Sequence, residues 1–289
     1  MTAIVILSRG NCGLSRCITR YLVAMATADL LVVLLAIIMQ QINFIYLFAY
    51  FLFKYPLCAV IIVLQLVASH CSVWFTVAFT FDRYMAICCE KLRKQYCTER
   101  TATVVISTAA AGSVAVSVPL FFAVDPRRCG PTVEYITSPT WASYELFVII
   151  ITPLLPIGLI ALFNALTVKY ITAANRVRRE LRCSGQNPKD PEVEKRRKSM
   201  ILLFAISANF ILLWMPHVLY SSKWQKQNYF YTDKYFSTPI YILQQFGFML
   251  RMLSICTNTC IYAMTQRRFR EQLKSGFKYL FTLTGQLYK

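Results

Sequence analysis

The stretch CAVIIVLQLVASHCSVWFTVAFTFDRY, residues 58–84, decides the fold of this chain. It begins with a cysteine, continues with mostly apolar residues and ends in Asp82-Arg83-Tyr84. Cys58 and Arg83 are 25 positions apart. In an α-helix this distance is roughly 37 Å, the hydrocarbon core of a bilayer plus part of one headgroup layer. Its polar residues Gln65, Ser69 and Ser72 share one helical face, so we predict a membrane-spanning helix within a bundle.

The composition of the whole chain is that of a polytopic membrane protein. Of its 289 residues, 57% are hydrophobic and 15% are charged, whereas a soluble domain carries about 25% charged residues. The formal net charge is +18. Apolar spans separate the basic clusters, which argues against a nucleic-acid-binding face. Lysine and arginine concentrate in alternate connections, and the positive-inside rule then places the C-terminus in the cytoplasm.

Long apolar segments predict an all-α membrane protein with a single domain, residues 1–289. Residues 1–8 are apolar but too short to span, so we interpret them as the stub of a truncated first helix. Residues 266–283 place basic and apolar positions on different faces, which predicts an amphipathic helix on the membrane surface. The complete spans are expected over residues 21–45, 58–88, 101–124, 141–171, 199–220 and 239–264.

Most of the 11 cysteines lie singly in apolar runs, where a thiol packs as a small hydrophobe. None shows the paired CxxC spacing of a metal site. Only Cys58 and Cys129 fall on the predicted outer side of the membrane. Disulfides persist there, and we therefore pair these two cysteines.

An ordered set of motifs resembles the rhodopsin-like (class A) G-protein-coupled receptors. The motifs are Ala28-Asp29, Asp82-Arg83-Tyr84, Pro156, Phe210…Trp214-Met215-Pro216 and Asn258-Thr-Cys-Ile-Tyr262. The connection after the third span, a fourth span without tryptophan and the Asn-x-x-x-Tyr form are similar to the G-protein-coupled receptor 139-like orphan group. The resemblance implies a seven-transmembrane bundle with a truncated first helix and a C-terminal amphipathic surface helix.

The resemblance also implies a function and partners. A receptor of this class lies in the plasma membrane, binds an extracellular ligand and activates a heterotrimeric G protein by outward movement of the sixth helix. The basic connections at residues 91–94 and 176–198 are expected to meet the G protein and anionic membrane lipid.

Asp29 lies at mid-membrane depth, where a carboxylate is costly unless it is paired, hydrated, ion-bound or protonated. In the resembled family the matching acid binds a sodium ion. The matching oxygen ligands here are Ser72, Ser254 and Asn258. The alternative is a protonated Asp29 in a structural hydrogen-bond network. Apart from this structural sodium ion, no cofactor is expected.

Arg83 resembles the activation switch of the family. The neighbouring Asp82 holds this arginine in the resting receptor, and activation releases it toward the G protein. The alternative is an interfacial arginine that reaches the lipid headgroups. Trp214 and Pro216 resemble a toggle and a kink that let the sixth helix swing, with plain packing as the alternative. The full set of implied switch residues is Asp82, Arg83, Tyr84, Phe210, Trp214, Pro216 and Tyr262.

The resemblance implies a ligand pocket that opens outward between the third, fifth, sixth and seventh helices. Gln65 is neutral where amine receptors carry an acid, which disfavours a monoamine ligand. Arg251 is a cation inside a membrane helix, suited either to a ligand carboxylate or to an internal partner such as Asp29 or a carbonyl. An aromatic amino acid or a small, neuropeptide-like ligand fits these residues. The implied lining is Gln65, Ser69, His217, Ser221, Gln244, Phe248 and Arg251.

Three other classes of protein fit the sequence less well. A transporter or channel predicts internal repeats or spans broken in matching halves, and neither occurs. A membrane enzyme needs acids, histidines or cysteines clustered at one depth. The two histidines are His70 and His217, and no second carboxylate lies near Asp29 in sequence, so we expect no enzyme. A receptor fragment that cannot fold is the third alternative.

The sequence predicts a resting state that signals without ligand. Many family members clamp the switch arginine with an acid at the start of the sixth helix. The matching position here is Arg196, and a second cation cannot clamp Arg83. Expressed with a completed first helix, the receptor should signal above mock-transfected cells in calcium or cyclic-nucleotide assays. Ligand-free signalling equal to that of mock cells would contradict this expectation.

Overall fold

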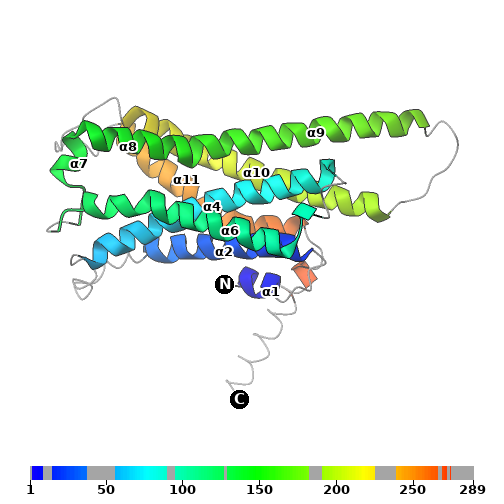
Figure 1. The fold of residues 1–289 in the computed structure, drawn as a ribbon, viewed down its shortest axis with the longest axis horizontal. Helices are drawn as coiled ribbons and strands as arrows, with labels where there is room; N and C mark the ends of the chain where they lie inside the picture. The colour runs from blue at the N-terminus through cyan, green and yellow to red at the C-terminus, as the bar shows by residue number, and fades with distance from the viewer. Residues whose placement is uncertain are drawn as a thin grey trace, which may run out of the picture.

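A computed structural model describes the fold, which in the described residues is helical apart from short connections and one isolated bridge between Val124 and Pro131. Figure 1 shows the long helices running side by side along one axis, with α7 at one end of the bundle. This arrangement confirms the predicted all-α membrane bundle. The described residues are 2–8, 15–37, 56–89, 95–126, 129–181, 191–224, 239–265, 269–271 and 274.

The helices follow the predicted spans, except that residues 38–45 of the first complete span lie outside the described residues. In the first half of the chain they are α1 (Thr2–Ser8), α2 (Arg16–Ile37), α4 (Leu57–Cys88), α6 (Glu99–Ser117) and the 3-10 helix η3 (Val118–Ala123). In the second half they are α7 (Val133–Thr137), α8 (Pro139–Ile149), the π-helical turn η4 (Ile150–Leu154), α9 (Leu155–Leu181), α10 (Pro191–Trp224) and α11 (Pro239–Thr265).

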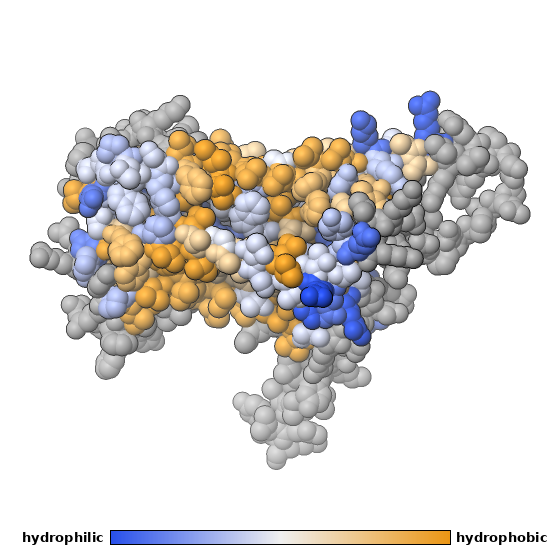
Figure 2. Space-filling view, in the orientation of Figure 1, coloured by the Kyte–Doolittle hydropathy of each residue, from blue (hydrophilic) through white to orange (hydrophobic). Residues whose placement is uncertain are grey.

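The surface of the bundle matches a bilayer. Figure 2 shows hydrophobic residues over the middle of one face and hydrophilic residues toward both ends. Among the described residues, five helical segments are long and apolar enough to cross a membrane; α11, which carries Arg251, is not one of them. The five are Arg16–Ala36, Leu57–Cys88, Glu99–Ala123, Pro139–Ala174 and Met200–Leu219.

Several helices begin earlier or end later than the apolar pattern predicts, because polar residues satisfy their ends. The α6 helix starts at Glu99 since Thr98 caps it, accepting the backbone N–H of Thr101 at 3.2 Å. Arg20, one turn after the start of α2, pairs with Glu99 in the first turn of α6. The α10 helix begins at Pro191, a residue favoured in a first turn.

The largest core cluster joins α1, α2, α4, α6 and α10. Leu22, Phe79 and Leu203 are each fully buried in it. Leu7 of α1 is 1% exposed and packs into the same cluster, so this short helix is docked against α2. Most of the predicted surface helix, residues 266–283, lies outside the described residues, but Phe269 is fully buried in this cluster.

A disulfide between Cys58 and Cys129 ties the start of α4 to the segment before α7. The structure therefore contains the cysteine pair that the sequence predicts. We call this the disulfide end of the bundle and the opposite end, with Asp82 and Arg83, the Arg83 end. The third span thus runs between the two ends, as its length requires.

Helices α10 and α11 approach each other closely at Gly247. A Cβ atom there would lie 3.1 Å from both the backbone N and the Cα of His217. That contact is closer than packed side chains normally allow, and its partner is backbone, which cannot rotate away. Gly247 is therefore required for the close crossing of these helices.

Replacing Gly247 with valine should force α10 and α11 apart and destabilise the fold. Overpacking of this kind costs about 1–3 kcal/mol. We expect a lower thermal unfolding midpoint for purified Gly247→Val than for Gly158→Val, because a Cβ at Gly158 meets nothing within 4 Å. Equal midpoints for the two variants would show that the helices do not cross closely at Gly247.

Candidate functional site

Asp29 is a buried acid that joins three helices. Its side chain lies on α2 and is only 5% exposed. The carboxylate accepts a hydrogen bond from the Ser72 hydroxyl on α4 and another from Asn258 Nδ2 on α11, the latter at 2.8 Å. These two donors replace the water that the carboxylate loses on burial. We call this group of three residues the Asp29 junction.

A second asparagine extends the junction to α10. Asn209 Nδ2 lies 3.4 Å from Asn258 Oδ1 and 3.2 Å from Ser254 Oγ. The Thr257 hydroxyl donates to Asn209 Oδ1 at 2.7 Å. Sequence reasoning did not select Asn209, although a polar amide within an apolar span was a signal for it. Four helices, α2, α4, α10 and α11, therefore meet in one hydrogen-bond network.

The predicted sodium ligands are only partly brought together. Ser72 and Asn258 contact Asp29, whereas Ser254 bonds Asn209 instead. Asn258 presents an N–H donor to the carboxylate, and a cation needs an oxygen there. The arrangement does not supply the full oxygen set, so it supports the structural hydrogen-bond alternative. The sodium ion stays a prediction.

Asp82 and Arg83 form an ion pair at the Arg83 end. Arg83 Nε donates to Asp82 Oδ2 at 3.1 Å, and its Nη2 contacts the same oxygen. The two side chains are 5% and 7% exposed, so Arg83 does not extend to the lipid headgroups. Cys17 Sγ on α2 donates to Asp82 Oδ1 at 3.1 Å. Sequence reasoning took this thiol for a small apolar residue and missed it.

Other predicted switch residues take packing positions. Tyr84 stacks on Phe163 of α9, with ring centroids 5.7 Å apart. Phe210 and Trp214 are buried together on α10, with centroids 5.2 Å apart, and pack with residues of α4 and α9. Pro216 lies inside α10, two residues beyond Trp214. The side chains of Glu192, Glu194, Arg196 and Tyr262 lie outside the described set.

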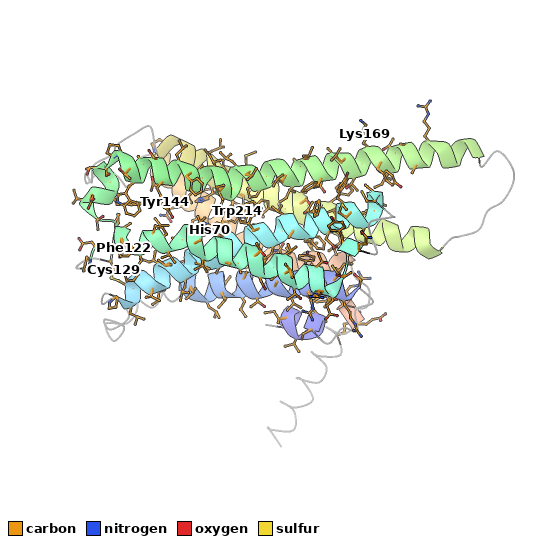
Figure 3. The ribbon with its side chains drawn as sticks, in the orientation of Figure 1. His70, Phe122, Cys129, Tyr144, Lys169 and Trp214 are labelled. Carbon is orange, nitrogen blue, oxygen red and sulfur yellow. A yellow bond between two sulfur atoms is a disulfide. The ribbon has the colours of Figure 1, made fainter. Side chains whose placement is uncertain are left out.

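A cavity of about 470 Å³ lies near the disulfide end, within the size range of ligand sites. Of the predicted pocket residues, Ser69, His217 and Arg251 line it. Gln65 and Phe248 do not line it, and the side chains of Ser221 and Gln244 lie outside the described set. Figure 3 shows His70, Tyr144 and Trp214, which all line the cavity, in the half of the bundle toward α7.

The roles of Gln65 and Phe248 as ligand contacts stay predictions, although neither residue lines this cavity. Phe248 instead packs against Arg251, with its ring centroid 5.4 Å from the guanidinium carbon. Residues nearer α7 take part in the lining instead, including Tyr135 and Glu145. The cavity therefore lies more toward α8 and the disulfide than the carried-over positions imply.

Arg251 lies between aromatic rings at the floor of the cavity. Its guanidinium carbon is 5.9 Å from the Trp214 ring centroid, as well as close to Phe248. Its Nε is buried without a hydrogen-bond partner. No carboxylate in the described part of the chain pairs with it, and the partners of Asp29 are Ser72 and Asn258. Arg251 therefore does not pair with Asp29, and the alternative of a backbone carbonyl partner stays a prediction.

These features define a multi-pass helical membrane protein with a ligand-sized cavity at one end and a buried ion pair at the other. Residues 1–262 match the model of the 7 transmembrane receptor (rhodopsin family), and the chain belongs to that family. This confirms the class A resemblance and a receptor rather than an enzyme. The narrower resemblance to the 139-like group stays a prediction.

The chain is also similar to a curated relative, the FMRFamide receptor of Drosophila melanogaster. The two are 23% identical over 293 residues, which cover 93% of this chain and 49% of the relative. The chain thus spans about half the length of that protein.

Removing the amide of Asn209 should loosen α10 from α11. In Asn209→Leu, Asn258 Oδ1 and Ser254 Oγ lose their hydrogen-bond donor. Each buried acceptor left unsatisfied lowers the free energy of unfolding by about 1–3 kcal/mol. We expect the thermal unfolding midpoint of the purified protein to fall. The matched control is Ala208→Leu, which introduces the same side chain at an exposed position on the same helix. If both variants unfold at the wild-type temperature, the Asn209 network contributes nothing to packing.

Proposed function

We propose that this protein is a G-protein-coupled receptor that binds an extracellular amino acid or short peptide in its cavity and activates a heterotrimeric G protein through its Arg83 end. Family membership supports the class of function. The observation that carries the proposal is the contact between Arg251, at the cavity floor, and Trp214 on α10. A ligand that moves Arg251 therefore acts directly on the helix that contains Pro216.

The proposed path of the signal follows α10. Pro216 interrupts the backbone hydrogen bonds of this helix. A displacement of Trp214 therefore moves the part of α10 that precedes Pro216 and extends toward the Arg83 end. That part carries Asn209, whose bonds to α11 must change when α10 moves. At the far end, rearrangement around Asp82 releases Arg83 to the G protein.

The proposed orientation places the disulfide end outside and the Arg83 end in the cytoplasm of the plasma membrane. A disulfide persists in the oxidising exterior, which supports the location of Cys58–Cys129. Basic residues concentrate in the connections at the Arg83 end, which supports the positive-inside orientation. The C-terminus is then cytoplasmic, and anionic lipid and the G protein meet the same basic surface.

Two considerations support a peptide or amino-acid ligand. The relative from Drosophila is named as a receptor for FMRFamide, a short peptide. The cavity combines the apolar rings of Trp214 and Tyr144 with the cation Arg251. Aromatic side chains and polar main-chain groups of a short peptide fit such a lining. The 139-like resemblance, with its expected aromatic amino-acid ligand, is part of the same proposal.

The role of Arg83 can be tested without knowledge of the native ligand. Purified protein in lipid nanodiscs should accelerate nucleotide exchange on a heterotrimeric G protein without added ligand. Arg83→Gln should lower this rate at least roughly tenfold, because charge-assisted hydrogen bonds contribute about 1.5–3 kcal/mol. Arg100→Gln removes an exposed arginine at the same end and serves as the control.

Exchange at the wild-type rate in Arg83→Gln would contradict the proposed coupling. Equal loss in both variants would mean that general positive charge, rather than Arg83, drives the interaction. Each purified variant should first show a wild-type unfolding midpoint, so that loss of exchange is separated from loss of fold.

A further inference from the structure

The cavity carries a negative charge as well as a positive one. Glu145 of α8 lines it together with Arg251 of α11. Sequence reasoning considered Arg251 and did not consider Glu145. The two residues come from different helices and do not form an ion pair with each other.

Glu145 lines the part of the cavity that is next to α7. Its carboxylate accepts a hydrogen bond from the hydroxyl of Tyr135, which stands on α7 next to the disulfide segment. Burial, together with the neighbouring carboxylate, raises the pKa of Tyr135, so the phenol stays protonated and continues to donate. Tyr135 also packs against Trp141, with ring centroids 5.3 Å apart. The carboxylate is therefore held in a fixed position by a neutral donor.

Arg251 is the positively charged group of the cavity. We call Arg251 the positive pole and Glu145 the negative pole. Trp214 and Phe248 pack against its guanidinium, and stacking of this kind orients the edge N–H groups for an acceptor in the guanidinium plane. His70 and His217 also line the cavity. The guanidinium gives this part of the cavity a positive charge, which suits an anionic group.

Neither pole has a countercharge in the described part of the chain. The ion pairs there are Arg16–Glu99, Arg20–Glu99 and Asp82–Arg83. A half-buried carboxylate and a largely enclosed guanidinium both lose hydration, and each is stabilised by an opposite charge. One ligand that carries both charges satisfies both poles at once.

We propose that the cavity binds a zwitterionic ligand, a free amino acid or short peptide whose carboxylate meets Arg251 and whose ammonium group meets Glu145. This inference rests on the proposed receptor function and narrows its ligand class. It separates a ligand with a free C-terminus from an amidated peptide, because an amide cannot form the charge-assisted bidentate pair with Arg251.

The experiment uses a dipeptide, Phe-Phe, in four forms: zwitterion, C-terminal amide, N-acetyl acid and N-acetyl amide. Binding to the purified full chain in nanodiscs is measured calorimetrically, independently of any G protein. The zwitterion should bind roughly 10–100-fold more tightly than either singly blocked form, as expected for loss of one charge-assisted contact. Failure of all four forms to bind, or tighter binding of a blocked form, would overturn the proposal.

Variants of the protein test which residue contacts each charged group of the ligand. In Arg251→Gln the advantage of the free acid over the amide should disappear, and Arg251→Lys should restore part of it. In Glu145→Gln the advantage of the free amine over the acetyl form should disappear. Glu134→Gln removes an exposed acid on α7 and should bind all forms as the wild type does. Unchanged discrimination in Arg251→Gln or Glu145→Gln would overturn the corresponding contact.

This failure is distinguishable from failure of the proposed function. If the four peptide forms bind equally well and nucleotide exchange still depends on Arg83, only the proposal of a zwitterionic ligand is overturned. Charge-dependent binding without any nucleotide exchange would overturn the receptor function and leave the ligand class standing.

Discussion

A carboxylate buried between helices is the constraint on which the rest of this structure depends. Asp29 cannot lose its water without other donors, and Ser72 and Asn258 supply them from α4 and α11. Asn209 adds α10 to the same network. Apolar packing has little preference for one helix register over another within a membrane, because lipid is as apolar as the helix surfaces. The polar junction provides that preference and fixes how the helices face one another.

The junction lies between two charged sites on the same helices. On the disulfide side, α10 and α11 carry Trp214 and Arg251 at the floor of the cavity. On the other side, α4 continues from Ser72 to the buried pair of Asp82 and Arg83. A displacement of α10 therefore strains the junction before it reaches Arg83. The close approach at Gly247 leaves α10 and α11 little freedom to slide, which favours rotation about Pro216 as the permitted motion.

The fold could be predicted from sequence because hydropathy, proline positions and the placement of Cys58 and Cys129 are all one-dimensional signals. The ends of helices were less predictable, since they depend on partners such as Thr98 and Arg20. In the site, Asp29 and Arg83 stood out because charge is rare in membrane spans. The sequence does not reveal partners that are neutral or distant in the chain. Cys17 and Asn209 gain a role only when another helix brings Asp82 or Asn258 near, and Glu145 only when α8 and α11 line the same cavity.

The central claim is that α10 swings about Pro216 when Arg83 engages a G protein. The most direct measurement is the distance between spin labels at Val104 of α6 and Ile201 of α10, two exposed positions toward the Arg83 end. The purified protein would be measured in nanodiscs, alone and bound to a nucleotide-free heterotrimeric G protein. The account predicts a longer distance in the complex. An unchanged distance in a complex that forms and exchanges nucleotide would contradict it.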